Sequence, residues 1–111
     1  MKYDFIFDLE TGKNVTDDNN ALYFNYCIRY YNTENGPKVD ISNNRLGSGV
    51  VLEAKHWNRL LRIIRDDELD KSGIEAIIKP LVPSCECHGL MIEKALLTAI
   101  KSREIKEFEQ K

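Results

Sequence analysis

Two acidic side chains near the N-terminus are spaced so that they could share a divalent cation. Asp8 and Glu10 are separated by one residue at the end of an apolar segment. Residues two apart on a strand point to the same side, and carboxylate oxygens are ligands that Mg²⁺ accepts. A metal ion held there could activate water for hydrolysis of a phosphodiester. The simpler interpretation is a strand that runs into a polar turn.

A second candidate for metal chemistry lies in the C-terminal half of the chain. Cys85, Cys87 and His88 carry the sulfur and nitrogen ligands that zinc prefers. A fourth ligand would have to come from His56 or Cys27. The simpler interpretation is a set of reduced thiols, because three cysteines are an odd number and zinc sites favour wider spacing of paired cysteines.

The chain has 111 residues, of which 42% are hydrophobic and 31% charged, and its net charge is −2. This composition predicts one soluble globular domain. No apolar run approaches the ~20 residues that span a bilayer, and the N-terminal stretch with Asp4 and Asp8 lacks the pattern of a secretory signal. A cytoplasmic protein is therefore expected. The sequence contains no nucleophile–base arrangement, phosphate-binding glycine loop or dinucleotide fingerprint, so neither an enzyme nor a cofactor is predicted.

The first half of the chain has the residue pattern of β-strands. Apolar and polar residues alternate over residues 2–9, and aromatic residues are abundant over residues 21–33. One face of these two strands is predicted to carry Tyr3, Phe5, Phe7, Leu9, Leu22, Phe24, Tyr26, Ile28 and Tyr30. The other face of the second strand is predicted to carry Tyr23, Cys27, Arg29 and Tyr31. Further along are two predicted short strands (38–42 and 49–52), a polar loop (11–20) and a tight turn at Asn35-Gly36.

The periodicity becomes helical from Lys55 onwards. Apolar residues then fall at positions i, i+3, i+4 and i+7: Trp57, Leu60, Leu61 and Ile64. Arginines fall mostly off that face, which is typical of a solvated surface: Arg59, Arg62 and Arg65. This helix is predicted to end between residues 66 and 69, and two more helices are predicted at 74–81 and 90–108.

Strands followed by helices predict an α+β fold with an antiparallel sheet, because the early connections are too short for parallel crossovers. The prediction is a four-stranded sheet followed by a helix over residues 1–69. Residues 70–111 would form a helical extension that packs on this unit or on a partner.

Three segments in the middle of the chain follow one another at a characteristic spacing: Ile28-Arg29-Tyr30-Tyr31, Gly49-Val50-Val51-Leu52 and Trp57-Asn58-Arg59-Leu60. In this order they resemble the single-stranded-DNA-binding domain of the transcriptional coactivator family called positive cofactor four. The resemblance covers residues 2–68. It implies a curved four-stranded sheet with a helix, a homodimer, and single-stranded DNA held along basic and aromatic ridges of the sheet.

The resemblance also implies which residues hold DNA. Arg29 matches the arginine of the family motif, and Tyr31 matches its aromatic neighbourhood. Aromatic rings can stack on unpaired bases, and cations neutralise phosphate and release counterions. Lys13, Lys38 and Arg45 are further candidates by charge and location. The leading hypothesis is a non-enzymatic single-stranded-DNA-binding protein that acts in transcription, or in replication and repair.

Two alternatives stay open. Residues 21–65 hold seven basic and three acidic residues, a charge of +4, while the rest of the chain is −6. The acidic total, and Gly47-Ser48 where the family has a basic pair, favour a protein-interaction module that has lost DNA binding. In that case the C-terminal helices could recruit a partner. The other alternative is a metal-dependent nuclease using Asp8 and Glu10, because Asp8-Leu9-Glu10-Thr11 resembles the first metal-binding motif of exonucleases with four acidic residues.

Overall fold

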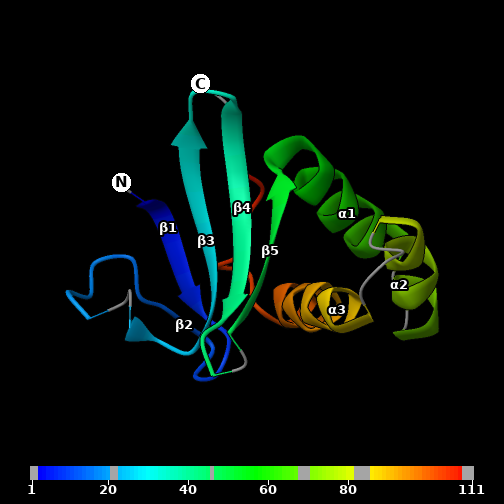
Figure 1. The fold of residues 1–111 in the computed structure, drawn as a ribbon. Coiled ribbons are helices and arrows are strands. Elements are labelled where there is room, and N and C mark those ends of the chain that lie inside the picture. Colours follow the sequence, from blue (N-terminus) through cyan, green and yellow to red (C-terminus); the bar gives the residue numbers. More distant parts are fainter. Residues whose placement is uncertain (1–2, 21–22, 46, 68–70, 82–85, 109–111) are drawn as a thin grey trace.

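The computed structural model describes residues 3–20, 23–45, 47–67, 71–81 and 86–108. Within these residues the chain is α+β, with one antiparallel sheet of five strands followed by three α-helices (Figure 1). The strands are β1 (Tyr3–Asp8), β2 (Lys13–Asn14), β3 (Tyr26–Thr33), β4 (Gly36–Asn43) and β5 (Ser48–Glu53). The helices are α1 (Ala54–Asp67), α2 (Lys71–Ile78) and α3 (Glu86–Lys101), and a 3₁₀ turn, η2 (Lys79–Leu81), follows α2.

The sheet has the strand order β2-β1-β3-β4-β5, so β2 and β5 are its edges. The α+β class with an antiparallel sheet is confirmed, but the sheet has one strand more than the four predicted. The additional strand, β2, pairs Lys13 with Asp8 and Asn14 with Phe7, within the segment predicted as a loop. Both residues of β2 are exposed, so no apolar alternation marks it in the sequence.

The predicted strand over residues 21–33 begins later than expected, at Tyr26. Before it, Tyr23 N donates to Asn20 O in a turn, and the Tyr23 side chain is 81% exposed. Phe24 packs against the cluster of Ile6 and Cys27 and therefore lies on the face opposite to the one predicted. Turn hydrogen bonds replace strand pairing here, so the alternation that follows Tyr26 does not extend backwards. Leu22 lies outside the described residues.

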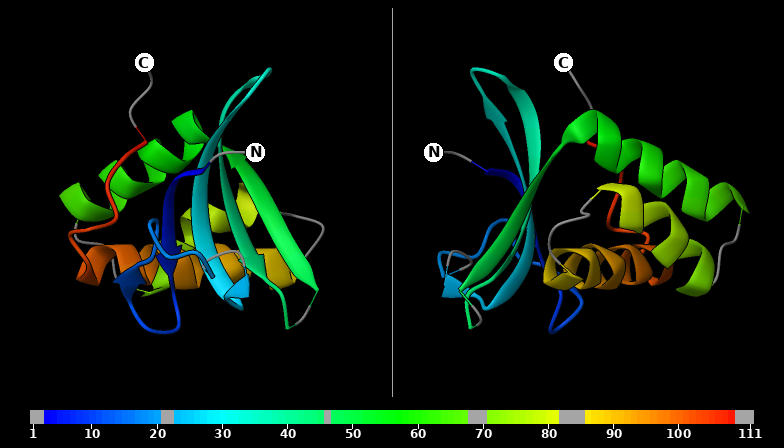
Figure 2. Two further views of the ribbon diagram at one scale, coloured as in Figure 1. Left: turned by 90° about the vertical axis from the view of Figure 1, so that its left-hand side faces the viewer. Right: turned by 45° about the vertical axis from the view of Figure 1, so that its right-hand side comes forward.

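The two faces of the sheet have different environments. All three helices lie on one side of it, the inner face (Figure 2). On the opposite, outer face, two rows of directly paired residues cross from β1 to β5. The first row is Ile6, Arg29, Asp40 and Val51, and the second is Asp8, Cys27, Ser42 and Gly49. Arg29 is therefore on the opposite side of the sheet from the helices.

The core lies between the inner face and the helices. The helical spacing predicted for α1 is confirmed, because its four apolar residues are all buried: Trp57, Leu60, Leu61 and Ile64. They share one core with residues of the strands, of α2 and of α3. The residues on either side of position 70 thus contribute to the same apolar cluster. None of the helices in the described part of the chain is long and apolar enough to cross a membrane.

The last helix ends seven residues earlier than predicted, at Lys101. Ser102 Oγ accepts a hydrogen bond from Glu104 N at 3.3 Å, a local turn that competes with helix continuation. The chain then runs back across α1 as a non-helical C-terminal segment, residues 102–108 (Figure 2). Ile105 and Phe108 of this segment are buried in the core. A helix would have carried these two side chains further along the axis of α3.

A chain of two hydrogen bonds, one buried and one partly buried, holds the C-terminal segment against β3 and α1. Trp57 Nε1 donates to Tyr30 Oη at 2.7 Å, and the Tyr30 hydroxyl donates to the Lys106 carbonyl at 2.7 Å. Burial raises the pKa of Tyr30 far above its usual value, so the hydroxyl stays protonated and remains a donor. The ring of Phe108 stacks on Tyr30 with centroids 5.1 Å apart.

Replacing Tyr30 by Phe leaves the indole N–H of Trp57 and the carbonyl of Lys106 without this partner. We expect the free energy of unfolding to fall by about 2–3 kcal/mol, because each buried polar group left unpaired costs about 1–3 kcal/mol. Urea denaturation followed by the fluorescence of the single tryptophan measures this change. The control is Tyr23→Phe, at an exposed position, where we expect a change below about 0.5 kcal/mol. Equal stabilities for the two variants would show that the buried hydroxyl does not hold the segment.

Candidate nucleic-acid interface

Arg29, the strongest candidate from the sequence, lies on the outer face but is buried. Its side chain is only 5% exposed. Nη1 donates to Ser42 Oγ on the neighbouring strand β4, and Nε has no hydrogen-bond partner among the described residues. A guanidinium in this position does not present itself to phosphate at the surface. It is instead part of a polar row within the sheet.

Asp40 is the residue directly opposite Arg29 on β4. Burial raises the pKa of Asp40, and the positive charge of Arg29 partly lowers it again. Cys27 lies in the next row and is fully buried. Burial raises the pKa of its thiol to about 11, against the attraction of Arg29. Cys27 is therefore protonated near neutral pH, and its surroundings do not favour the thiolate that a zinc ligand requires.

Tyr31 is also largely buried. Its ring meets that of Tyr3 edge-on, with centroids 5.6 Å apart and an interplanar angle of 79°. Burial raises the pKa of Tyr31. The tyrosine pair packs across β1 and β3, and less than a tenth of Tyr31 is left open to solvent. A ring enclosed in this way has little free surface on which a base could stack.

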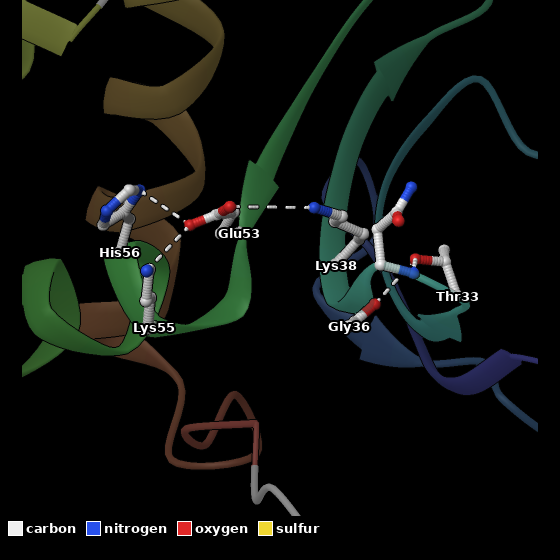
Figure 3. A network of polar contacts seen from close by, with 7 residues as sticks. Thr33, Gly36, Lys38, Glu53, Lys55 and His56 are labelled. Carbon is white, nitrogen blue, oxygen red and sulfur yellow. Dashed lines mark hydrogen bonds and ion pairs between the residues drawn. The ribbon is translucent and has the colours of Figure 1, made fainter.

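Lys38 lies on β4 beside the edge strand and faces an acidic residue. Its Nζ is 3.9 Å from Glu53 Oε1. Lys55 and His56, at the start of α1, approach the same carboxylate at 3.3 Å and 3.9 Å (Figure 3). Lys55 is the main cause of a lowered Glu53 pKa. Glu53 therefore offsets part of the positive charge at both Lys38 and Lys55.

The remaining predicted cations lie at other parts of the surface. Lys13 is on the edge strand β2. Arg45 lies in the loop that follows β4, with Nη2 3.9 Å from Glu10 Oε2. Lys38 is near the opposite end of β4 from Arg45. The three predicted cations are thus spread over the edge strand β2 and the two ends of β4, and the central strand β3 holds the buried Arg29 and Tyr31.

The two carboxylates proposed for magnesium have local roles. The buried Asp8 accepts hydrogen bonds from Glu10 N at 3.1 Å and from Thr11 Oγ1 at 2.7 Å, which closes the turn after β1. Glu10 points towards Arg45. The described residues contain no group of three potential metal ligands. Cys85 lies outside the described residues, as do the side chains of Cys87 and His88, so the proposed zinc ligands are not placed.

A different surface gathers positive charge. Between α1 and the C-terminal segment is a hollow of about 960 Å³, which we call the basic groove. It is lined by Lys55, Asn58, Arg59, Arg62, Arg65, Lys106, Glu107 and Phe108. Five of these residues are cations and one is a carboxylate, so the formal charge of the lining is +4. This is a large local excess for a chain whose net charge is −2.

Two polar residues of α1 build the second wall of the groove by binding the C-terminal segment. Asn58 Nδ2 donates to Phe108 O at 2.8 Å, and Asn58 Oδ1 accepts from Phe108 N at 2.7 Å. Arg65 Nη2 donates to three carbonyl oxygens, those of Ala99 (2.8 Å), Ser102 (3.4 Å) and Ile105 (2.5 Å). These bonds fix the backbone of the segment, and the end of α3 at Ala99, against α1.

The cations of the groove differ in how far they are already neutralised. Lys55 is 3.3 Å from Glu53, which lies outside the lining, and Arg62 forms a 2.6 Å ion pair with Glu107. Arg65 is bonded to neutral carbonyls, which leaves its charge uncompensated. The side chains of Arg59 and Lys106 have no ion-pair partner within the described part of the chain. They are the cations most available to an incoming anion. The sequence marks this face only weakly, by arginines off the apolar side of the helix.

Comparison with protein-family models, curated proteins and solved structures finds no match for this chain.

The neighbouring charges of Arg29 and Asp40 should contribute to the stability of the fold. Arg29→Met removes the cation, and we expect a loss of roughly 2 kcal/mol at about pH 7. The value lies below the ~3–5 kcal/mol of a fully buried ion pair, because Asp40 is only partly buried and acts on Arg29 as its neighbour in register across the strands. The guanidinium lowers the pKa of Asp40, so this pKa rises further in the variant. The lost attraction applies only while Asp40 is ionised, and the destabilisation should shrink towards about pH 3, where the carboxyl is protonated.

Urea denaturation of wild type and Arg29→Met at the two pH values measures this difference. Arg45→Met removes an exposed arginine and is the matched control, with little expected effect at either pH. A destabilisation by Arg29→Met that does not change with pH would contradict the coupling to Asp40.

Proposed function

We propose that this protein is a non-enzymatic nucleic-acid-binding protein that holds single strands, and that the phosphates lie in the basic groove. The observation that carries the proposal is the charge of the groove lining, with five cations against one carboxylate. A cluster of this kind attracts a polyanion because each neutralised phosphate releases condensed counterions.

The shape of the cluster favours an extended anion over a single phosphate group. Its cations on α1 run from Lys55 to Arg65, a distance of about 15 Å at ~1.5 Å of rise per residue. Lys106 adds a cation from the C-terminal segment on the opposite wall. A chain of phosphates can contact several of these groups at once, whereas a small anion would contact one or two.

This proposal keeps the class of ligand expected from the resemblance to positive cofactor four but changes the surface. The resemblance implied the sheet, with Arg29 and Tyr31 as central contacts. Their burial leaves α1 as the better candidate, because its exposed Arg59 lines the groove. Arg59 is common to the resemblance and to the groove. It lies within the motif segment Trp57-Asn58-Arg59-Leu60, and on α1 it lines the groove.

Two double variants with the same charge change compare the two surfaces. Arg59→Gln with Lys106→Gln lowers the formal charge of the groove lining from +4 to +2, whereas Lys13→Gln with Arg45→Gln removes two charges from predicted contacts of the sheet. We expect the groove variant to weaken binding of a labelled oligothymidine. Its slope of log affinity against log salt should fall by roughly 0.7 per lost phosphate contact. The sheet variant should bind like wild type. Fluorescence anisotropy over a range of salt concentrations measures both quantities.

Three results would contradict the proposal. They are the absence of oligothymidine binding by wild type, equal losses in the two double variants, and tighter binding of a duplex or of a poly-glutamate peptide than of the single strand. The last result would assign the groove to a different polyanion.

A second candidate function is protein–protein interaction through the edge strand β5. The observation that favours it is Val51, which is 54% exposed on the edge strand β5, beside the compensated charges of Lys38 and Glu53. An edge strand presents unpaired backbone groups that can pair with another strand. The partner we propose is a second copy of the chain, in keeping with the homodimer expected from the sequence.

A lysine at position 51 should prevent pairing through this edge, because charged residues on edge strands oppose strand association. Sedimentation equilibrium of wild type should give the mass of a dimer, and Val51→Lys should give the monomer with unchanged circular dichroism. Tyr23→Lys, at another exposed apolar position, is the control and should remain a dimer. A monomeric wild type at high protein concentration would count against this interface.

A further inference from the structure

A second hollow lies on the other side of the C-terminal segment from the basic groove. Its volume is about 990 Å³. The two hollows share three consecutive lining residues, Lys106, Glu107 and Phe108. Only the width of the segment therefore separates them, and a ligand in the groove can reach the second hollow by crossing it.

The floor of this second hollow is aromatic. Phe5, Tyr30 and Phe108 line it together. The rings of Phe5 and Tyr30 have centroids 4.8 Å apart, and those of Tyr30 and Phe108 are stacked at 5.1 Å. The hydrogen bonds of the Tyr30 hydroxyl to Trp57 and Lys106 hold the central ring in place. Tyr30 and Phe108 are themselves buried and hold Phe5 in place, so the partly exposed Phe5 is the ring of this cluster on which a ligand can pack.

The rim of the hollow carries amide and carboxylate groups. Asn32 Nδ2 donates to Asp4 Oδ2 at 3.0 Å, and Asn14, from β2, completes this side of the lining. The Asp4–Asn32 bond uses one oxygen of the carboxylate and one proton of the amide, so further acceptor and donor positions remain on both groups. These are the groups that hydrogen-bond to the edges of heterocyclic bases.

The charge of this hollow differs from that of the groove. Two cations line it, Arg103 and Lys106, against three carboxylates, those of Asp4, Glu104 and Glu107. The formal total is −1, which does not favour phosphate. An aromatic floor with a polar rim and little net charge suits a planar, uncharged ring instead.

We propose that the second hollow receives an unpaired base of the strand whose phosphates occupy the basic groove. This inference rests on the proposed function. The base packs on the Phe5 side of the aromatic floor, and its polar edge meets Asn32 and Asp4. In a duplex the bases are stacked and paired, so none can cross the C-terminal segment without first leaving the helix. The second hollow is therefore the part of the protein that selects single strands.

An abasic oligonucleotide, which has the phosphates but lacks the bases, separates the two sites. Wild type should bind oligothymidine about tenfold more tightly than its abasic analogue, in the range expected for one base stacked on a protein ring. Asn32→Ala and Phe5→Leu should each reduce this ratio and leave binding of the abasic strand unchanged. Asn19→Ala, at an exposed position outside the hollow, is the matched control and should keep the ratio of wild type.

Emission from a single 2-aminopurine in the oligonucleotide gives a second readout. It should be quenched when wild type binds, and the quenching at saturation should be lost in Phe5→Leu but retained in Arg59→Gln with Lys106→Gln. Equal affinities of wild type for the normal and abasic strands would overturn the base site and leave the groove intact. Failure of wild type to bind either strand would instead refute the proposed function itself.

Discussion

The buried hydroxyl of Tyr30 connects three parts of the molecule that are far apart in the chain. It accepts from Trp57 on α1 and donates to the backbone of Lys106 in the C-terminal segment. The bond from Trp57 is buried and the bond to Lys106 is partly buried, and a buried polar group left unpaired costs about 1–3 kcal/mol. The position of the segment is therefore tightly constrained, and with it the wall that separates the basic groove from the second hollow.

This arrangement resolves the conflict between an acidic chain and a proposed nucleic-acid ligand. The net charge of −2 is a property of the whole sequence, whereas a phosphate in the groove is exposed chiefly to charges within about one Debye length, ~8–10 Å at moderate salt. The groove lining has a formal charge of +4 there. The hollow across the segment is close to neutral. Two neighbouring sites of different charge suit the two chemically different parts of a nucleotide.

On the outer face of the sheet, the cost of burying charged groups opposes their mutual attraction. Arg29 and Asp40 are paired across two central strands, and Arg29 bonds to Ser42 rather than to solvent. Burial and opposite charge act against each other on Asp40, as expected for ionised groups that are partly removed from water. The guanidinium of Arg29 therefore joins strands β3 and β4 on the outer face through its hydrogen bond to Ser42.

The sequence by itself determined the α+β class, the antiparallel pairing of the main strands and the buried stripe of α1, because these depend on periodicities within one element. It also indicated the arginines on the exposed side of that helix. Only the tertiary structure decided that Arg29 is buried, since this depends on its neighbours across the sheet. The same holds for the C-terminal segment. A local turn at Ser102 follows the end of α3. The side chains of Asn58, Arg65 and Tyr30, which are distant in sequence, then hydrogen-bond to the backbone of the C-terminal segment. The groove needs both walls, and no pattern along a single stretch of chain predicts that they meet.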